Sequence, residues 1–256
     1  MASVMPFTQV YYPESDGKPM GETDEHRDQM FRHIELLRHY YRQQQVYVSG
    51  DLLVYYEQGN PRKFVVPDAF VVKNVMSRQR RIYKIWVEGK SPDVVIETTS
   101  RKTRRKDTEQ KPPLYARLGV KEYFLYDPTQ EYLDPPLQGH RLTHHGYERI
   151  AADERQALVS EELGLRLQIE SGLLQFYRLD TGERLLTAEE REAEAQQREA
   201  EAQQREAEAQ RREAEAQQRE AEAQQREAEA QRREAEARKV AEAALAELER
   251  LRKEQR

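Results

Sequence analysis

The chain has 256 residues, of which 42 are lysine or arginine, 47 are aspartate or glutamate and none is cysteine, so its formal charge is −5. The absence of cysteine excludes disulfides, thiolate metal sites and cysteine nucleophiles. No window approaches the roughly 18 consecutive apolar residues of a membrane-spanning helix and the N-terminus lacks the pattern of a signal peptide, so we expect a soluble cytoplasmic protein with no membrane partner.

The last third of the chain is a low-complexity repeat, which cannot form a hydrophobic core of its own. We therefore expect an extended N-terminal segment at residues 1–22, one globular domain at residues 23–186 and a repeat helix at residues 187–256. The repeat contains 15 basic and 20 acidic residues, so it carries the whole net charge and the rest of the chain is neutral. The zero net charge outside the repeat argues against a protein that binds nucleic acid through a high overall positive charge. Local basic clusters can still attract a phosphate backbone.

The first regular element is a predicted helix with one apolar face. Thr23 or Asp24 is a suitable N-cap, because side-chain oxygens at this position accept hydrogen bonds from the first free amides. Apolar side chains then recur at spacings of four, three and four, at Met30, Ile34, Leu37 and Tyr41. We expect this face to be buried against a sheet.

The central part of the chain predicts an α/β core. Runs of β-branched and aromatic residues predict strands at residues 46–48, 52–56, 63–72, 93–98 and 122–126. Residues 101–119 are mostly helical by pattern and end at Gly119, a typical residue after a helix C-terminus. The order strand, strand, helix, strand predicts a mixed sheet.

The region from Tyr132 to Leu186 predicts hairpins. Short strand-like runs are separated there by dipeptides that favour turns, namely Gln138-Gly139, His145-Gly146 and Ser171-Gly172.

The tail from Arg191 repeats the sequence Arg-Glu-Ala-Glu-Ala-Gln-Gln every seven residues, which predicts a helix of roughly 60 residues. A coiled-coil seam through Ala237, Ala241, Ala244, Leu248 and Leu251 would alternate alanine with glutamate in the earlier heptads. That is a poor seam. We therefore expect a solvated single helix over most of the tail, with weak self-association confined to its C-terminal end, and a weak coiled coil as the alternative.

Acidic residues on two predicted strands are the main chemical signal. If strands 64–72 and 93–98 are antiparallel neighbours with a symmetric connection, Asp68 lies opposite Glu97. Two such oxygen ligands suit Mg²⁺, which commonly keeps several waters. Asp93 lies on the same strand face as Glu97 but about 13 Å away, which makes it a weaker candidate. The alternative is that Pro67-Asp68 and Pro92-Asp93 simply begin strands after turns.

An ordered series of short motifs accompanies these acids: Val66-Pro67-Asp68, Pro92 to Glu97 with Ser100, Lys111, Leu114 to Arg117, Gly119-Val120, and Glu122 to Pro128. In this series the stretch from Glu22 to Leu186 resembles the Uma-two family of restriction-endonuclease-like proteins, a branch of the PD-(D/E)xK nuclease superfamily. The resemblance implies a restriction-endonuclease-like fold, with a mixed central sheet flanked by helices. It also implies that Asp68 and Glu97 are metal ligands.

The resemblance also implies a catalytic lysine. In the superfamily it normally follows the acid by two residues, where this chain has Thr99. The resemblance points instead to Lys111 in the following helix, with Lys106 as the reserve. Because Pro112-Pro113 follows directly and proline is unfavourable inside a helix, we expect Lys111 at a helix break or at the start of a new helix. A surface role for Lys111 is the alternative.

The first predicted helix offers further candidates. His26 and His33 are seven residues apart and could share a face, but helical histidines more often cap or pack, so His26 is a weaker catalytic candidate. A third acid, as in related nucleases, could come from Glu22, Glu25 or Glu35.

We interpret the chain as a Mg²⁺-dependent endonuclease, with Mn²⁺ as an alternative ion, that hydrolyses DNA phosphodiester bonds. In this hypothesis Asp68 and Glu97 bind the metal and Lys111 assists the attacking water. DNA phosphates would contact the basic stretch, Arg101, Lys102, Arg104 and Arg105. Two alternatives remain: a nucleic-acid-binding module that has lost catalysis, and a scaffold whose helical tail recruits a partner.

Overall fold

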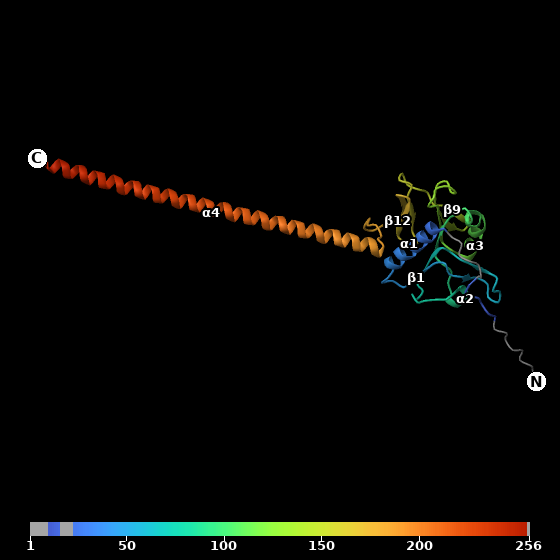
Figure 1. Ribbon diagram of the computed structural model, residues 1–256. Helices are drawn as coiled ribbons and strands as arrows, with labels where there is room; N and C mark the ends of the chain where they lie inside the picture. Colours follow the sequence, from blue (N-terminus) through green and yellow to red (C-terminus); the bar gives the residue numbers. More distant parts are fainter. Residues whose placement is uncertain (1–9, 16–22, 255–256) are drawn as a thin grey trace, which may run out of the picture. The chain divides into compact units, whose positions relative to one another are not determined.

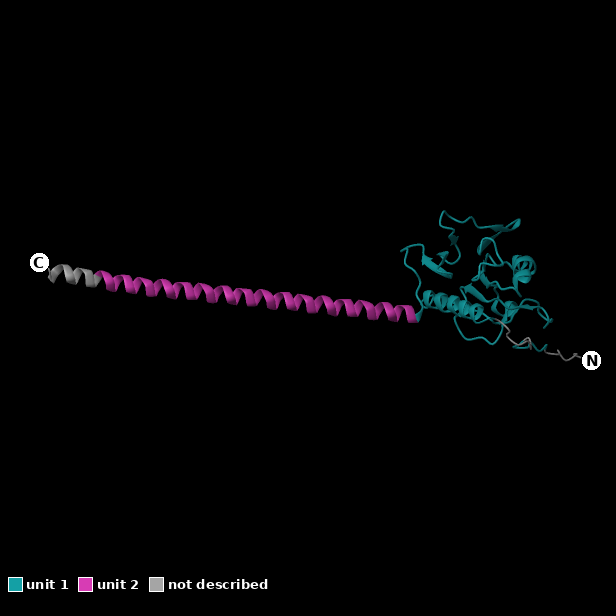
Figure 2. Ribbon diagram, turned by 45° about the horizontal axis from the view of Figure 1, so that its top comes forward, with its two compact units in different colours: residues 1–188 teal, residues 189–256 magenta. Residues whose placement is uncertain are grey.

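A computed structural model describes residues 10–15 and 23–254 of the chain, with side chains up to Leu245 in the C-terminal helix. The chain divides into two compact units, residues 1–188 and 189–256 (Figure 2). Most of the expected N-terminal segment, including the candidate acid Glu22, lies outside the described residues, as do the side chains of Leu248 and Leu251.

The first unit is built on a mixed six-stranded sheet of order β1-β4-β6-β7-β8-β9. Its strands are β1 (Val46–Ser49), β4 (Ala69–Lys73), β6 (Val94–Thr98), β7 (Glu122–Tyr126), β8 (Leu137–Thr143) and β9 (Gly146–Arg149). Strands β6 and β7 are parallel, and the other neighbours in the sheet are antiparallel. The α/β class and the mixed sheet predicted from the sequence are confirmed.

Helix α1 (Asp24–Tyr40) covers one face of this sheet (Figure 1). The Thr23 side chain caps it by accepting a hydrogen bond from the His26 amide. The predicted apolar face is buried in one core with alternate residues of the central strands, such as Ile96 and Phe124. Because side chains alternate across a strand, the intervening residues point to the opposite face.

The opposite face of the sheet packs against helix α3 (Lys111–Leu118) through a second core that contains Val95, Tyr115 and Tyr123. Helix α3 ends at Gly119, whose φ of 79° lies in the left-handed region that glycine favours. A π-helix, η1 (Lys106–Gln110), directly precedes α3. The helical stretch predicted at 101–119 is therefore present, but it begins at residue 104 and contains a wider turn.

Two small sheets complete the first unit. One has the order β3-β2-β5 and the other the order β10-β11-β12. The first contains β2 (Val54–Tyr55), β3 (Phe64–Val65) and β5 (Tyr83–Lys84), which is followed by α2 (Ile85–Glu88). The second contains β10 (Leu158–Ser160), β11 (Leu165–Glu170) and β12 (Leu173–Arg178).

Two predictions of local structure need correction. The strand predicted from residue 63 to residue 72 is interrupted at residues 66–68, so that β3 and β4 belong to different sheets. The turn predicted at Gln138-Gly139 lies inside β8. Gly139 is needed there because a Cβ would lie 2.8 Å from Cε1 of Phe124. The other two hairpin turns are present, at His144-His145, directly before Gly146, and at Ser171-Gly172.

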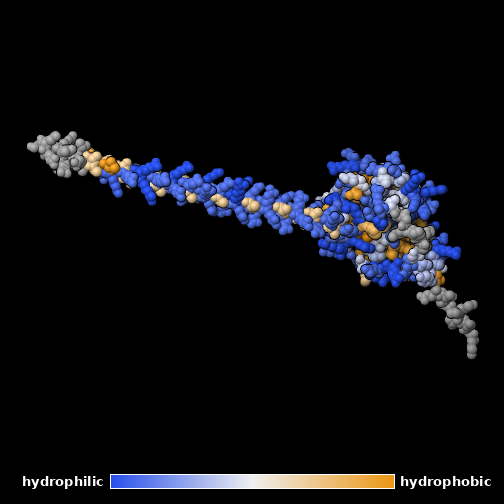
Figure 3. All heavy atoms as spheres, in the orientation of Figure 1, coloured by the Kyte–Doolittle hydropathy of each residue, from blue (hydrophilic) through white to orange (hydrophobic). Residues whose placement is uncertain are grey.

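The second unit is the long helix α4, which spans Ala188–Glu254 and has 67 residues. Its described side chains are exposed from Glu192 onward, and they are mostly hydrophilic with small apolar groups recurring along the helix (Figure 3). Glutamate and arginine pair four residues apart, as in Glu194 with Arg198 and Glu201 with Arg205, each at 3.4 Å. In the described part of the chain, no helix is both long and apolar enough to cross a membrane.

Candidate active site

Asp68 and Glu97 lie side by side where β4 and β6 pair. The antiparallel register joins Ala69 to Ile96, and its continuation by one residue sets Asp68 opposite Glu97. The Asp68 amide donates a hydrogen bond to Oε2 of Glu97 at 3.2 Å. The local sequence also requires Gly50, since a Cβ at that position would lie 1.9 Å from the Asp68 carbonyl oxygen. The two acids expected from the sequence are thus adjacent in space.

The Asp68 carboxylate has one occupied and one open oxygen. Its Oδ2 accepts a hydrogen bond from the Thr98 amide at 2.7 Å and lies 3.4 Å from Nε2 of His26. Its Oδ1 makes no hydrogen bond to any residue that the structure describes, and 19% of the side chain is exposed. This arrangement fixes the carboxylate in a partly exposed position through Oδ2 alone.

Glu97 is fully buried and held by side chains from the helical layer. The Tyr115 hydroxyl donates to its Oε1 at 2.7 Å, and Nζ of Lys111 lies 2.8 Å from its Oε2. Tyr115 and Lys111 are four residues apart on α3 and therefore project from the same face of the helix. The helix thus delivers two donors to one carboxylate.

Lys111 sits at the junction between η1 and α3. Its amide donates to the Lys106 carbonyl and closes the π-turn, while Pro112 and Pro113 follow it in the first turn of α3. Pro112 and Pro113 lack the N–H groups that a continuous α-helix would need there, but the first turn of a new helix does not need them. The proline pair accordingly separates two helical segments and places Lys111 at the start of the second, one of the two positions expected from the sequence.

Asp107 is a site residue that the sequence reasoning missed. It is fully buried in η1, and its Oδ1 lies 2.8 Å from Nζ of Lys111. A signal was present, because an acid four residues before a lysine on a helix commonly forms an ion pair. The chain contains many such pairs, so the spacing alone does not single out Asp107.

Burial and mutual charge shift the pKa values of these groups. Burial, together with the neighbouring Asp68 and Asp107 carboxylates, raises the pKa of Glu97 to about 8 although Lys111 opposes the shift. Burial likewise raises the pKa of Asp107, again against the Lys111 charge. Burial acts to lower the pKa of Lys111, but Glu97, Asp107 and Asp68 raise it above its usual value. For Asp68 the effect of burial is outweighed by the His26 hydrogen bond and the Lys111 charge, so its pKa is lowered.

These residues fit a divalent cation. When ionised, the three carboxylates and one ammonium leave two uncompensated negative charges, which a divalent ion would balance. No group of three or more histidine, cysteine, aspartate or glutamate side chains forms a metal-binding set within the described residues. Asp68 and Glu97 alone would supply two hard oxygen ligands, a number that suits Mg²⁺ because this ion commonly keeps several waters.

The first helix brings His26 to the site and leaves the other candidates elsewhere. His33 is buried between Tyr126 and Phe176, where burial lowers its pKa to about 3, so it serves as a neutral packing residue. Glu25 is exposed in the first turn of α1. Glu35 accepts a hydrogen bond from the Ala188 amide at 2.6 Å, at the start of α4.

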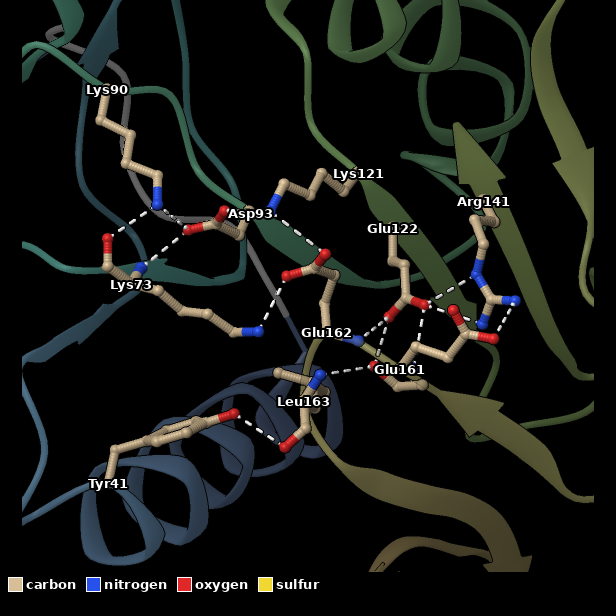
Figure 4. A network of polar contacts seen from close by, with 11 residues as sticks. Tyr41, Lys73, Lys90, Asp93, Lys121, Glu122, Arg141, Glu161, Glu162 and Leu163 are labelled. Atoms are coloured by element: carbon tan, nitrogen blue, oxygen red, sulfur yellow. Dashed lines mark hydrogen bonds and ion pairs between the residues drawn. The ribbon is translucent and has the colours of Figure 1, made fainter. Parts of the chain in front are cut away.

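Asp93 belongs to a different polar network, which is drawn in Figure 4. Its carboxylate accepts from the Lys73 amide at 2.7 Å and pairs with Lys90 at 2.9 Å and Lys121 at 3.1 Å. Lys73 and Lys121 also pair with Glu162, next to β10. Asp93 precedes β6 whereas Glu97 lies near its other end, so Asp93 links the central sheet to a small sheet and is not brought to the candidate site.

The basic stretch after β6 is exposed. Its members are Arg101, Lys102, Arg104, Arg105 and Lys106. Ser100 and Thr103 exchange hydrogen bonds between backbone and side chain and so shape the start of the following helix. Arg105 pairs with Glu109 at 3.0 Å. Lys106, the reserve candidate, begins η1, and within the described part of the chain it forms no hydrogen bond or ion pair with Asp68 or Glu97. The stretch therefore joins the strand that carries Glu97 to the helix that carries Lys111.

Comparisons with known proteins found a family and a solved structure that the chain resembles. A family model, Uma2, described as "Putative restriction endonuclease", matches residues 10–181. A solved structure from Anabaena variabilis, described as a "putative nuclease belonging to DUF820", is similar at 14% identity with a TM-score of 0.42. The similarity covers 60% of this chain and 86% of that chain. Curated proteins yielded no match.

Proposed function

Because the chain belongs to the Uma2 family of restriction-endonuclease-like proteins, we propose that it is a metal-dependent endonuclease that hydrolyses DNA phosphodiester bonds. We propose Mg²⁺ as its ion, with Mn²⁺ as a substitute. The observation that carries the proposal is the convergence of Asp68, Glu97 and Lys111 in one partly buried cluster, from two paired strands and the start of a helix. Phosphodiester hydrolysis needs such a set: oxygen ligands for a cation and a positive group near the developing charge.

The chain's own residues have separate roles in this proposal. Asp68 and Glu97 would hold a divalent ion, which when bound lowers the pKa of a coordinated water and polarises the phosphate. The Thr98 amide and His26 orient Asp68, while Tyr115 orients Glu97. The Lys111 ammonium would stabilise the negative charge that develops on the phosphate oxygens.

The exposed basic stretch would position the DNA. Arg101, Lys102, Arg104 and Arg105 follow directly after the strand that carries Glu97. Arginine and lysine contacts to phosphates contribute affinity without reading sequence. We therefore propose that this stretch binds the backbone and contributes little to any sequence preference.

Nicking of supercoiled plasmid DNA tests the proposal. The wild-type protein should nick the plasmid with Mg²⁺ or Mn²⁺ and lose this activity when the ion is chelated. Asp68→Asn should reduce cleavage at least about a hundredfold, the scale expected when a transition-state-stabilising group is removed. The substitution preserves side-chain shape, so circular dichroism and the melting temperature should show a folded protein.

Asp153→Asn is a matched control, because Asp153 lies in the loop before β10 and its carboxylate accepts hydrogen bonds from the Arg155 and Ala157 amides. This variant should cleave like the wild type. Salt-dependent DNA binding without cleavage in any divalent metal would reject the nuclease proposal and support a binding module that has lost catalysis.

A further inference from the structure

The Lys111 ammonium lies between two buried carboxylates from different elements. Its Nζ is 2.8 Å from Oε2 of Glu97 on β6 and 2.8 Å from Oδ1 of Asp107 on η1. Only 16% of the lysine side chain is exposed, and both carboxylates are closed to solvent. The position of the ammonium therefore depends on both acids.

Glu97 has competing tasks in the proposed reaction. Its Oε2 already accepts the Asp68 amide as well as the Lys111 ammonium, and its Oε1 accepts the Tyr115 hydroxyl. A divalent ion on Glu97 would compete with Lys111 for the same carboxylate and repel the ammonium at short range. Without another anchor, Lys111 would leave the site when the metal enters it.

Asp107 is placed to provide that anchor. Its amide donates to the Thr103 carbonyl at 3.0 Å, and its carbonyl accepts from the Tyr123 hydroxyl at 2.8 Å, so its backbone is fixed from two sides. Within the part of the chain that the structure describes, the only salt bridge of Asp107 is the one with Lys111. A buried carboxylate is costly without a counter-charge, so Asp107 strongly favours keeping the ammonium beside it.

We propose that Asp107 is a positioning residue that retains the Lys111 ammonium in the site while Glu97 binds the metal, an inference that rests on the proposed function. Asp107 acts through Lys111 and need not touch DNA or the metal. The wider π-turn before the proline pair places the two residues on one side of the helix, facing Glu97.

Chemical labelling of lysines tests this role without measuring cleavage. An amine-reactive acylating reagent is applied to the full chain with and without saturating Mg²⁺, and labelling of Lys111 is quantified by mass spectrometry. In the wild type Lys111 should stay protected in both conditions. In Asp107→Asn it should stay protected without Mg²⁺, because Glu97 still holds it, and become severalfold more reactive when Mg²⁺ is added.

Internal and matched controls accompany this measurement. Lys121, which is half exposed at 51%, serves as the labelling standard within the same protein. Glu109→Gln changes an exposed acid of the same turn that pairs with Arg105, and it should leave Lys111 protected with Mg²⁺. Asp107→Glu keeps the negative charge and should restore protection.

The contradicting results are distinct. If Asp107→Asn binds divalent metal, as Mn²⁺ binding would show, but its Lys111 stays protected from labelling in saturating Mg²⁺, then Asp107 does not retain the ammonium and the inference is wrong. If Asp107→Asn fails to fold, labelling of the wild-type protein still tests the inference. A rise in its Lys111 labelling on adding Mg²⁺ would overturn the inference. If calorimetry detects no Mn²⁺ binding to the wild type, or the same binding to Asp68→Ala, the proposed function fails and this inference fails with it.

Discussion

Two buried glutamates on neighbouring strands differ in how their negative charge is compensated. Glu122, at the start of β7, accepts hydrogen bonds from the guanidinium of Arg141, the Ser160 hydroxyl and two backbone amides of the following loop (Figure 4). Glu97 shares a single ammonium with Asp107 and lies beside Asp68. Glu122 has the Arg141 guanidinium and several further donors, whereas Glu97 and the buried Asp107 have only one ammonium between them, an excess of negative charge that supports the proposed cation site.

The uncompensated charge predicts a pH dependence of stability. Burial and the neighbouring carboxylates raise the pKa of Glu97 from 4.5 to about 8. A carboxyl group with a higher pKa in the folded state stabilises the fold when protonated, and this stabilisation disappears as the pH rises from 4.5 to about 8. The metal-free protein should therefore lose up to a few kcal/mol of unfolding free energy over this interval, at about 1.4 kcal/mol per unit of pKa shift.

Glu97→Gln should show a smaller loss, because the amide does not ionise. Urea denaturation of both proteins at several pH values, with metal chelated, measures the difference. Glu109→Gln, which alters an exposed acid, should retain the wild-type slope. Parallel curves for the wild type and Glu97→Gln would show that Glu97 is not the group responsible.

Some site residues could be predicted from the sequence because short motifs mark them. Asp68 and Glu97 follow proline-initiated runs, and Lys111 lies in an ordered series of motifs shared with a known family. Tyr115 lies in the same series, but neither it nor Asp107 was assigned to the site. Whether they reach Glu97 depends on the rotation of α3 about its own axis, which the π-turn sets and periodicity does not reveal.

At the scale of elements, the apolar pattern determined more than the turns did. The buried face of α1 follows from residues that must face a core, and it was predicted. The register of β4 with β6 is the one expected for antiparallel neighbours with a symmetric connection. The interruption of the predicted strand at residues 66–68 was anticipated only by the alternative in which Pro67-Asp68 begins a strand after a turn. Its cause is tertiary: Pro67 accepts a hydrogen bond from the Asp51 amide, and Gly50 lets the backbone approach Asp68.

A glycine gave a wrong prediction of local structure, and a pair of prolines gave a correct one. Gly139 lies in a dipeptide that favours a turn, yet it occupies a strand because Phe124 leaves no room for a Cβ. Pro112 and Pro113 correctly indicated a change of helix at Lys111, because the missing N–H groups act locally. Rules that depend on the backbone of the residue itself transferred from sequence to structure, whereas a rule that depends on a neighbour's side chain did not.

At the scale of the whole molecule, the tail differs from the first unit in what stabilises it. The described side chains of α4 after Arg191 are exposed, and its regular contacts are pairs four residues apart within the helix. Such pairs contribute about 0.2–0.5 kcal/mol each to a lone helix. A seam that alternates glutamate with alanine would bury few methyl groups and would desolvate charge, so it favours a single helix over a pair.

We predict that an isolated peptide of residues 189–256 is monomeric and helical, with a circular-dichroism signal that is nearly independent of concentration. Its helicity should fall with added salt, because salt screens the exposed ion pairs. Sedimentation equilibrium measures the mass. A tight dimer at micromolar concentration would contradict the prediction and identify the tail as an oligomerisation device.

The central claim is that Asp68 and Glu97 together hold a divalent cation, and anomalous diffraction from crystals soaked in Mn²⁺ tests it most directly. The account predicts a Mn²⁺ peak within ligand distance of Oδ1 of Asp68 and a carboxylate oxygen of Glu97, and no peak there in Asp68→Ala crystals. Crystals of Asp153→Asn should retain the peak. Absence of Mn²⁺ beside Asp68 in the wild type, or a peak beside Asp93 and Glu162 instead, would contradict the account.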